Sequence, residues 1–268
     1  CHHGCYGDPI ARTEAIDSLA ADGRLYEQCI ATAPVCAPSR CSYVTGHYAF
    51  SLGTHNMRSW TFAQPETFME ILRENGYYVN WANKQDFNFT PRDEYADEER
   101  LWFDDLAEGN LPDKPWFLYY NFDITHESYM WPSKWERGVV PHLGEGAFTD
   151  PADVPVPEYI PDRLTSRRDI ARYYDALHLQ DREMRKILDA LDKSGHADNT
   201  VVIYIGDHGR GLPREKRWCY DAGCHVPLIV RWPGEIEPGT REENVVSGVD
   251  IAPTILSIAG IEPPQHYQ

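Results

Sequence analysis

Two short runs of almost uninterrupted apolar residues limit most strongly what this chain can fold into. They occupy residues 115–122 (Pro-Trp-Phe-Leu-Tyr-Tyr-Asn-Phe) and 200–205 (Thr-Val-Val-Ile-Tyr-Ile). Successive side chains of a strand point to opposite sides of a sheet, so a strand that is apolar at consecutive positions is buried on both faces. The two runs therefore predict an α/β fold, in which helices cover both faces of a mainly parallel central sheet.

The rest of the chain alternates between helical and extended patterns. Apolar residues recur at three- and four-residue intervals between 167 and 191, which is typical of a long amphipathic helix. Further helices are expected at 13–23, 68–76 and 249–256, and further strands at 25–31, 77–82 and 226–231. The Trp- and Pro-rich segment 129–161 has little periodicity, so we expect a long ordered loop there.

Length and charge exclude several classes of function. The 268 residues can bury a substantial core, and no linker divides them, so one domain is expected. A net charge of -17 argues against nucleic acid or an anionic membrane as a partner. No apolar run approaches the roughly 20 residues of a membrane span. An anionic substrate would therefore need a pocket that is locally basic.

The segment Cys36-Ala37-Pro38-Ser39-Arg40 combines features of an anion site. Pro38 suits the first turn of a helix and Gly46 suits its end, so Cys36 is expected at a helix N-terminus. Free N–H groups and the helix dipole favour negative charge there, and Arg40 adds a cation one turn on. We expect this segment to hold a tetrahedral oxyanion, although a cysteine at such a position is often only a small buried apolar residue.

Polar residues follow three of the expected strands within four positions. They are Lys84 after 77–82, His126 after 115–122, and Asp207 with His208 after 200–205. Open α/β sheets place ligand-binding groups at the carboxyl ends of their strands. A carboxylate beside an imidazole is also a plausible half of a metal site. The structural alternatives are a solvated loop lysine and a buried histidine with its hydrogen bonds satisfied.

The string Cys-x-Pro-Ser-Arg, followed by Thr45-Gly46, resembles the signature of the type I sulfatases, which belong to the alkaline-phosphatase-like superfamily. In that family a maturation enzyme oxidises the cysteine to formylglycine, whose hydrated aldehyde attacks sulfur. The resemblance implies this role for Cys36, with Arg40 as a cation of the same site. It also implies that His126 protonates the leaving oxygen.

The same resemblance assigns roles to residues further along the chain. Lys84 matches the lysine of a Lys-x-His pair that grips sulfate, while Asp86 stands where the histidine would be. Lys216 resembles a second sulfate-binding lysine. Asp207 and His208 resemble the pair that holds a divalent ion together with the modified Cys36, with calcium as the first choice and magnesium as the second.

For the whole chain, the resemblance implies a partial sulfatase catalytic domain over residues 1–268. The family's first strand, which ends in two metal-binding aspartates, and its C-terminal subdomain have no counterpart in the sequence. The segment 156–161 and the long helix after it resemble the sulfamidase and heparan-sulfatase branch. The implied substrate is a sulfate ester or sulfamate of a small molecule or glycan, and the implied location is periplasmic, extracellular or lysosomal. A phosphodiesterase or phosphonate monoester hydrolase of the same superfamily is one alternative, and a non-catalytic anion- or glycan-binding relic is another.

Overall fold

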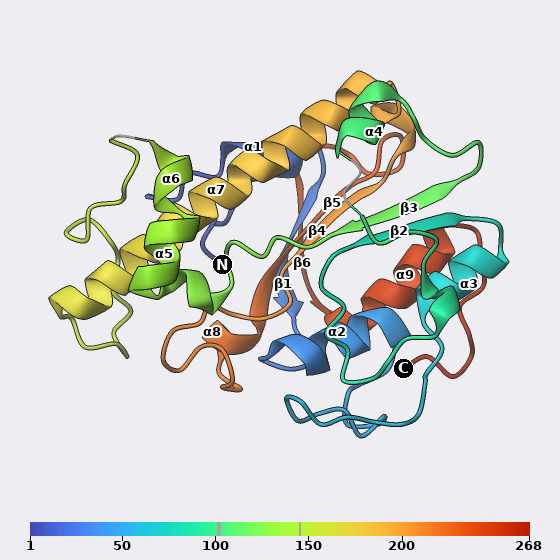
Figure 1. The fold of residues 1–268 in the computed structure, drawn as a ribbon, viewed down its shortest axis with the longest axis horizontal. Coiled ribbons are helices and arrows are strands. Elements are labelled where there is room, and N and C mark those ends of the chain that lie inside the picture. Colours follow the sequence, from blue (N-terminus) through green and yellow to red (C-terminus); the bar gives the residue numbers. More distant parts are fainter. Residues whose placement is uncertain (101–102, 145) are drawn as a thin grey trace.

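The computed structural model describes residues 1–100, 103–144 and 146–268 (Figure 1). The strands are β1 Arg24–Ile30, β2 Tyr78–Ala82, β3 Trp116–Tyr120, β4 Val202–Ile205, β5 His225–Arg231 and β6 Thr240–Ser247. The helices are α1 Glu14–Ala21, α2 Cys36–Thr45, α3 Phe68–Glu74, α4 Phe103–Glu108, α5 Pro132–Gly138, α6 Val140–Leu143, α7 Leu164–Ser194, α8 Asp221–Cys224 and α9 Ile251–Ile258. Every strand predicted from the sequence is present, within two residues of its predicted ends.

The strands form two sheets in the described part of the chain. The larger sheet has the order β4-β5-β1-β6, and the smaller one joins β2 to β3. The pairs β1–β6 and β2–β3 are parallel, whereas β5 is antiparallel to both β1 and β4. Three of the four strands in the larger sheet therefore share one direction, and β5 is the exception to the predicted parallel arrangement.

Helices cover both faces of the larger sheet, as predicted. On one face Leu25 of β1 and Ile229 of β5 pack with α1 and with Met184 and Leu188 of the long helix α7. On the other face Leu228 and its neighbours pack toward α9. Figure 1 shows α7 running across one side of the sheet and α2 and α9 on the other. Successive side chains of β5 point to opposite faces of the sheet and thus belong to two separate hydrophobic cores.

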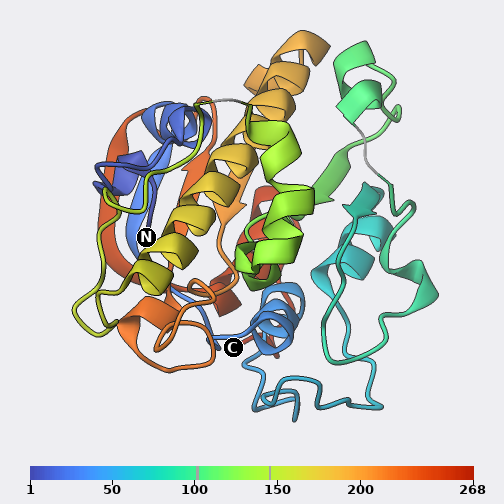
Figure 2. The same ribbon diagram turned by 60° about the vertical axis from the view of Figure 1, so that its left-hand side comes forward.

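A cavity of about 900 Å³ lies between the facing edges of β3 and β4. The strand order leaves β4 at the edge of the larger sheet and β3 at the edge of the smaller one. Side chains of α7, including Leu177 and Met184, and of α2 and α9, including Val44 and Ile255, line the same cavity. Figure 2 shows the part containing β2 and β3 standing apart from the larger sheet. The cavity is therefore enclosed as a strand in the middle of a sheet would be, with a neighbouring strand at either edge and helices over both faces.

The structure corrects a further expectation from the sequence and adds a strand that was not predicted. The segment 129–161, expected to be a loop, contains α5 and α6. Proline occupies the first turn of both helices, where its missing N–H costs nothing, and its presence hid them from a reading based on periodicity. Strand β6 was not predicted either, because its polar, largely exposed sequence gives no apolar signal. Among the described residues, none of the helices has the length and apolar character that crossing a bilayer requires.

Candidate active site

The N-terminus of α2 places Cys36 beneath the carboxyl ends of β3 and β4. Val35 before it is extended, with φ −157° and ψ 149°, and Gly46 after the helix is left-handed, with φ 63°. The prediction that a helix begins at Cys36 and ends at Gly46 is confirmed. Two turns along α2, Tyr43 donates a hydrogen bond of 2.6 Å to the carbonyl oxygen of Gly206, just after β4. This bond fixes the helix against the end of that strand.

Cys36 is in direct contact with His208. Its Sγ lies 3.1 Å from Nε2, while Nδ1 of the same ring lies 2.6 Å from the carbonyl oxygen of Gly209. A carbonyl oxygen only accepts, so Nδ1 carries a proton. Burial raises the pKa of the Cys36 thiol, but the imidazoles of His126 and His208 outweigh it and lower that pKa to about 5. Cys36 is therefore a thiolate at neutral pH.

The loop that carries His208 depends on a close approach of two backbone segments. Gly209 donates to the carbonyl oxygen of Gly223 over 2.9 Å, and a Cβ on Gly209 would lie 1.9 Å from the carbonyl oxygen of Ala222. Only glycine fits this position, so the Gly-Asp-His-Gly sequence is held against the chain before β5.

Arg40 connects the ends of the two sheets. Its guanidinium donates to Asp207 Oδ2 over 2.9 Å, to the hydroxyl of Tyr119 on β3, and to the side-chain oxygen of Asn121. Burial raises the pKa of Asp207, but His208, Arg40, Lys84 and Lys216 together lower it well below its usual range. Asp207 is therefore ionised beside a buried arginine.

Lys84 lies in a loop whose backbone is strained. Asn83, Lys84 and Asp86 have φ values of 73°, 36° and 53°, in the left-handed region that such residues rarely adopt. Asn83 and Asn121 exchange hydrogen bonds of 3.0 and 3.1 Å, which tie this loop to the end of β3. Strain of this kind persists only where surrounding contacts hold it, and it is common at binding sites.

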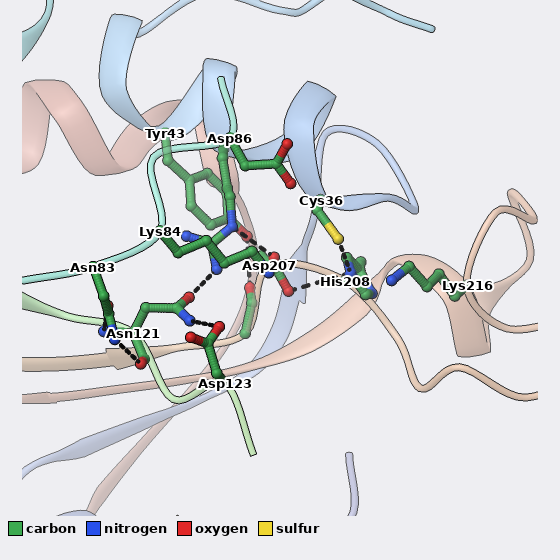
Figure 3. Close-up of polar contacts among 12 residues, drawn as sticks. Cys36, Tyr43, Asn83, Lys84, Asp86, Asn121, Asp123, Asp207, His208 and Lys216 are labelled. Carbon is green, nitrogen blue, oxygen red and sulfur yellow. Dashed lines mark hydrogen bonds and ion pairs between the residues drawn. The ribbon is translucent and has the colours of Figure 1, made fainter. Parts of the chain in front are cut away.

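Asp86 and Lys84 both line a second cavity, the outer cavity, which also contains Cys36, but Asp86 forms an ion pair with Arg58. Figure 3 shows the side chain of Lys84 directed toward Asp207. The structure therefore brings Lys84 toward the site centre, and it places the carboxylate of Asp86 toward the Arg58 side of the cavity.

Lys216 reaches the site from the segment between β4 and β5. Its Nζ lies 2.9 Å from Glu127 Oε2, and Arg217 contacts the other oxygen of that carboxylate at 2.7 Å. Burial raises the pKa of Glu127, but Arg217 and Lys216 lower it to about 2. The backbone N–H of Arg217 donates to the carbonyl oxygen of Pro34 over 2.7 Å, which ties this segment to the chain just before α2.

His126 caps a short helical turn after β3. Its Nδ1 accepts the N–H of Ser128 over 3.2 Å and lies 2.9 Å from the hydroxyl oxygen of the same residue. A neutral imidazole that accepts at Nδ1 carries its proton on Nε2. His126 is thus arranged as a donor, and it is one of the two histidines that interact with Cys36.

All predicted site residues line one of two adjoining cavities. An outer cavity of about 580 Å³ contains Cys36, Lys84, Asp86, His126 and Lys216 among its lining residues. The cavity between the sheets is lined by Arg40, Asp207 and His208, and it shares Lys84, His126 and Glu127 with the outer one. Figure 3 shows how Cys36, Asp207, His208 and Lys216 converge.

Three of these residues also form a potential metal-binding cluster. The ligand atoms of Cys36, Asp207 and His208 all lie within 4.8 Å of one another. They are one sulfur, one carboxylate oxygen and one imidazole nitrogen. Calcium takes six to eight oxygen ligands, and magnesium also requires oxygens. The donor set of the unmodified chain therefore does not fit either ion.

Three residues at the site were not predicted. Tyr119 and Asn121 accept hydrogen bonds from Arg40, and Glu127 holds Lys216 and Arg217. Asn121 could have been found, because it is the polar residue in the apolar run 115–122. Glu127 gave no signal, since its partners lie about ninety residues further along the chain.

The α/β core that carries this site has the alkaline-phosphatase-like fold of the solved sulfatase structures to which it is similar. The chain belongs to the sulfatase family, whose model matches residues 2–261. It is 30% identical to an ulvan-active sulfatase of Formosa agariphila over 98% of this chain and 50% of that protein. It is 23% identical to human iduronate 2-sulfatase, over 97% of this chain and 67% of that protein. The chain thus spans about half the length of the first of these relatives.

Solved structures show the same fold at low sequence identity. One described as a 2-O GAG sulfatase has a TM-score of 0.72 and 20% identity, covering 99% of this chain and 69% of that one. A phosphonate monoester hydrolase from Silicibacter pomeroyi has a TM-score of 0.71 and 17% identity, covering 100% and 73%. The α/β fold class predicted from the sequence is confirmed.

Proposed function

We propose that this chain forms the catalytic core of a sulfate ester hydrolase that acts on a sulfated glycan through formylglycine made from Cys36. The observation that carries the proposal is the position of Cys36. Its sulfur lies at a helix N-terminus, 3.1 Å from His208, in a cavity that Lys84, His126 and Lys216 also line. Residues 1–268 are, in this proposal, the greater part of one catalytic domain.

The reaction begins with a covalent step. A maturation enzyme first removes two electrons from the Cys36 side chain with an external oxidant, and water replaces the sulfur, which leaves as sulfide, to give an aldehyde. Water then hydrates this aldehyde to a pair of hydroxyls on one carbon. One of these hydroxyls gives its proton to water as its oxygen attacks sulfur, and the bond between sulfur and the leaving oxygen breaks. His126, protonated on both ring nitrogens with Nδ1 directed at the Ser128 hydroxyl oxygen, gives its Nε2 proton to that leaving oxygen, so the alcohol departs neutral and the ring is left as a neutral imidazole.

The second step releases sulfate without attack of water on sulfur. The remaining hydroxyl gives its proton to the neutral imidazole of His126, and its electron pair re-forms the carbonyl double bond. The bond from that carbon to the sulfate oxygen breaks, and sulfate leaves. Water then hydrates the aldehyde for the next cycle.

The cations of the site hold the anion during both steps. Oxygens around sulfur repel a nucleophile, so their charge must be balanced for attack to occur. Arg40, Lys84 and Lys216 come from three different segments, and each has an electrostatic effect on the same carboxylate, Asp207. A sulfate group over Cys36 would lie between the two lysines, and Lys216 would then exchange part of its contact with Glu127 for the substrate.

Maturation also changes the metal chemistry of the site. Formylglycine replaces the sulfur of Cys36 with oxygen, so Asp207, His208 and the modified residue become an oxygen-rich set that suits calcium, or magnesium as the second choice. Such an ion would balance charge on the sulfate oxygens. The cavity between β3 and β4 has room and surroundings for a further strand, whose end would supply the remaining oxygen ligands at the same edge.

Two observations favour a glycan as the substrate. The relatives named above act on ulvan and on iduronate sulfate, according to their names. Beside the site, the exposed rings of Trp218 and Tyr220 stack with centroids 6.2 Å apart and an interplanar angle of 15°. The guanidinium of Arg214 lies 4.7 Å over the Tyr220 ring, and the aromatic surface that stays exposed suits the apolar face of a sugar ring. A periplasmic, extracellular or lysosomal location completes the proposal.

The test compares two ester classes on the matured enzyme, produced together with a maturation enzyme. We expect kcat/KM for an aryl sulfate to exceed that for the matching phenylphosphonate ester by about tenfold or more. Cys36→Ala should abolish turnover, and the mass of the Cys36 peptide should change as thiol becomes aldehyde. A preference for the phosphonate ester would establish the alternative hydrolase, and sulfate binding without turnover by the modified enzyme would establish a binding relic.

A further inference from the structure

The three clustered side chains around Cys36 are of different chemical types. Sulfur, imidazole nitrogen and one carboxylate oxygen together form a donor set of intermediate softness. Such sets are typical of zinc, which binds Cys, His and Asp in four-coordinate sites. The donor set that does not fit calcium therefore fits zinc.

Neighbouring contacts already orient two of the three ligands. Nδ1 of His208 donates to the Gly209 carbonyl oxygen, which directs Nε2 toward Cys36, where a metal ion would replace the Nε2 proton. Metal-bound histidines commonly have their second nitrogen held in this way. Arg40 contacts Oδ2 of Asp207 and leaves Oδ1, which lies 3.5 Å from His208 Nε2, facing the cluster.

Two of the three separations between ligand atoms suit one tetrahedral ion, and the third, between sulfur and the carboxylate oxygen, is within 4.8 Å. Zinc binds sulfur at about 2.3 Å and nitrogen or oxygen at about 2.0–2.2 Å, so tetrahedral angles set sulfur and nitrogen about 3.6 Å apart and nitrogen and oxygen about 3.4 Å apart. The corresponding separations here are 3.1 Å and 3.5 Å. A movement of about half an ångström by one side chain would accommodate the ion.

The ligand set itself balances the charge of the ion, although the ammonium group of Lys84 is also directed toward Asp207. A thiolate and a carboxylate balance the two charges of zinc within the ligand set. Lys216 is paired with Glu127 at 2.9 Å, and Arg40 with Asp207. Cys36 also lines the outer cavity, which gives an ion a path of entry and room for a water molecule as the fourth ligand.

We propose that, before Cys36 is oxidised, this cluster is a zinc site with Cys36, Asp207 and His208 as its protein ligands. The proposal goes beyond sulfate hydrolysis, because it concerns the unmodified chain. Maturation removes the sulfur and thereby changes the class of metal that the site prefers, from zinc to a harder ion. The state of Cys36 thus selects the metal.

The experiment uses the whole chain, produced in a host that lacks the maturation enzyme and freed of metal with a chelator. Titration calorimetry with Zn²⁺ alone should show one equivalent bound, and Ca²⁺ at the same concentration should show none. Co²⁺ in place of zinc should give an intense near-ultraviolet band from thiolate-to-cobalt charge transfer, which reports sulfur ligation directly.

Two ligand variants and one control separate this site from adventitious binding. Cys36→Ser keeps the shape but replaces the sulfur, so it should remove the cobalt band and weaken zinc about a hundredfold or more. His208→Asn should weaken zinc to a similar degree. Cys219→Ser, which removes an exposed and unpaired thiol, should leave both readouts unchanged.

Equal zinc affinity in the parent chain and in Cys36→Ser, or calcium binding that zinc does not displace, would overturn the proposal. Because the readouts are binding and absorbance of the unmodified chain, neither outcome bears on sulfate hydrolysis. Loss of hydrolysis in the matured enzyme would likewise leave the zinc site intact.

Discussion

Arg40 donates to Asp207 across 2.9 Å and so joins the helix that follows β1 to the residue that follows β4. The two residues are separated by 167 positions in the chain. Further contacts of the same guanidinium reach Tyr119 and Asn121 on the other sheet. One buried side chain therefore holds together both sheet edges that flank the cavity between β3 and β4.

This arrangement predicts an unequal effect of two arginine substitutions. Arg40→Ala should lower the free energy of unfolding by about 3 kcal/mol, because it leaves the carboxylate of Asp207 without its buried partner. Arg58→Ala removes a cation whose side chain is 73% exposed and paired with Asp86, so the loss should be under about 1 kcal/mol. Urea denaturation of both variants measures the difference. Equal losses would mean that Arg40 does not hold the two sheet edges together.

Asp181 supports a second stability prediction. Asp181 of the long helix α7 accepts the backbone N–H groups of Ala15 and Ile16 at 3.0 and 2.9 Å. It caps the first turn of α1 from another helix. Asp181→Ala should cost about 2 kcal/mol, because two buried N–H groups lose their acceptor. Asp189→Ala, an exposed aspartate of the same helix, should cost less than about 0.5 kcal/mol in the same denaturation assay, and a matching loss there would refute the capping role.

The elements that were predicted well are those whose apolar residues form a recognisable pattern within one short segment of the sequence. The runs 115–122 and 200–205 contain β3 and β4, and the pattern of 167–191 lies within α7. Strand direction was not readable for β5, because burial on both faces gives the same composition in either direction. Its antiparallel pairing with β1 depends on the path of the chain between distant segments.

The site was predictable where one short segment carries its signal. Cys36 and Arg40 share one helix turn, and Asp207 with His208 follows a strand directly. The cavity between β3 and β4 could not be derived from these patterns, nor could the contact of Glu127 with Lys216. Both arise from segments that meet only in the folded chain, and no local periodicity encodes that meeting.

Sulfate recognition predicts matched losses for two lysines. In the matured enzyme, Lys84→Ala and Lys216→Ala should each lower kcat/KM by about a hundredfold, which corresponds to about 3 kcal/mol of transition-state stabilisation. Lys193→Ala, at the exposed end of α7, should leave it unchanged. If either site variant keeps full kcat/KM while remaining folded, that lysine does not contact the reacting sulfate.

His126 should show a dependence on the leaving group. His126→Ala should slow hydrolysis of an alkyl sulfate strongly, since a poor leaving group needs the proton. An activated aryl sulfate should be affected little, because its oxygen leaves without a proton. Steady-state kcat on both substrates measures this contrast, and equal losses on the two would assign His126 another role.

The thiolate state of Cys36 predicts an unusual pH dependence in the unmodified chain. Alkylation requires the thiolate, so its rate follows the fraction of Cys36 that is ionised. With a pKa of about 5, that fraction is nearly complete above about pH 6 and falls about tenfold for each pH unit below 5. The folded-state pKa lies below the unfolded value of about 8.5. The thiolate therefore stabilises the fold fully above about pH 8.5, and this contribution is lost as pH falls through 5.

The rate of iodoacetamide labelling of Cys36 measures this ionisation. Followed by mass spectrometry of the Cys36 peptide in the presence of a chelator, it should be level between about pH 6 and 8. His208→Asn removes one of the two histidine contacts, so the midpoint of its profile should rise by about one pH unit or more. A parent rate that climbs steadily from pH 6 to 9 would show that Cys36 is an ordinary thiol and that His126 and His208 do not stabilise its ionised form.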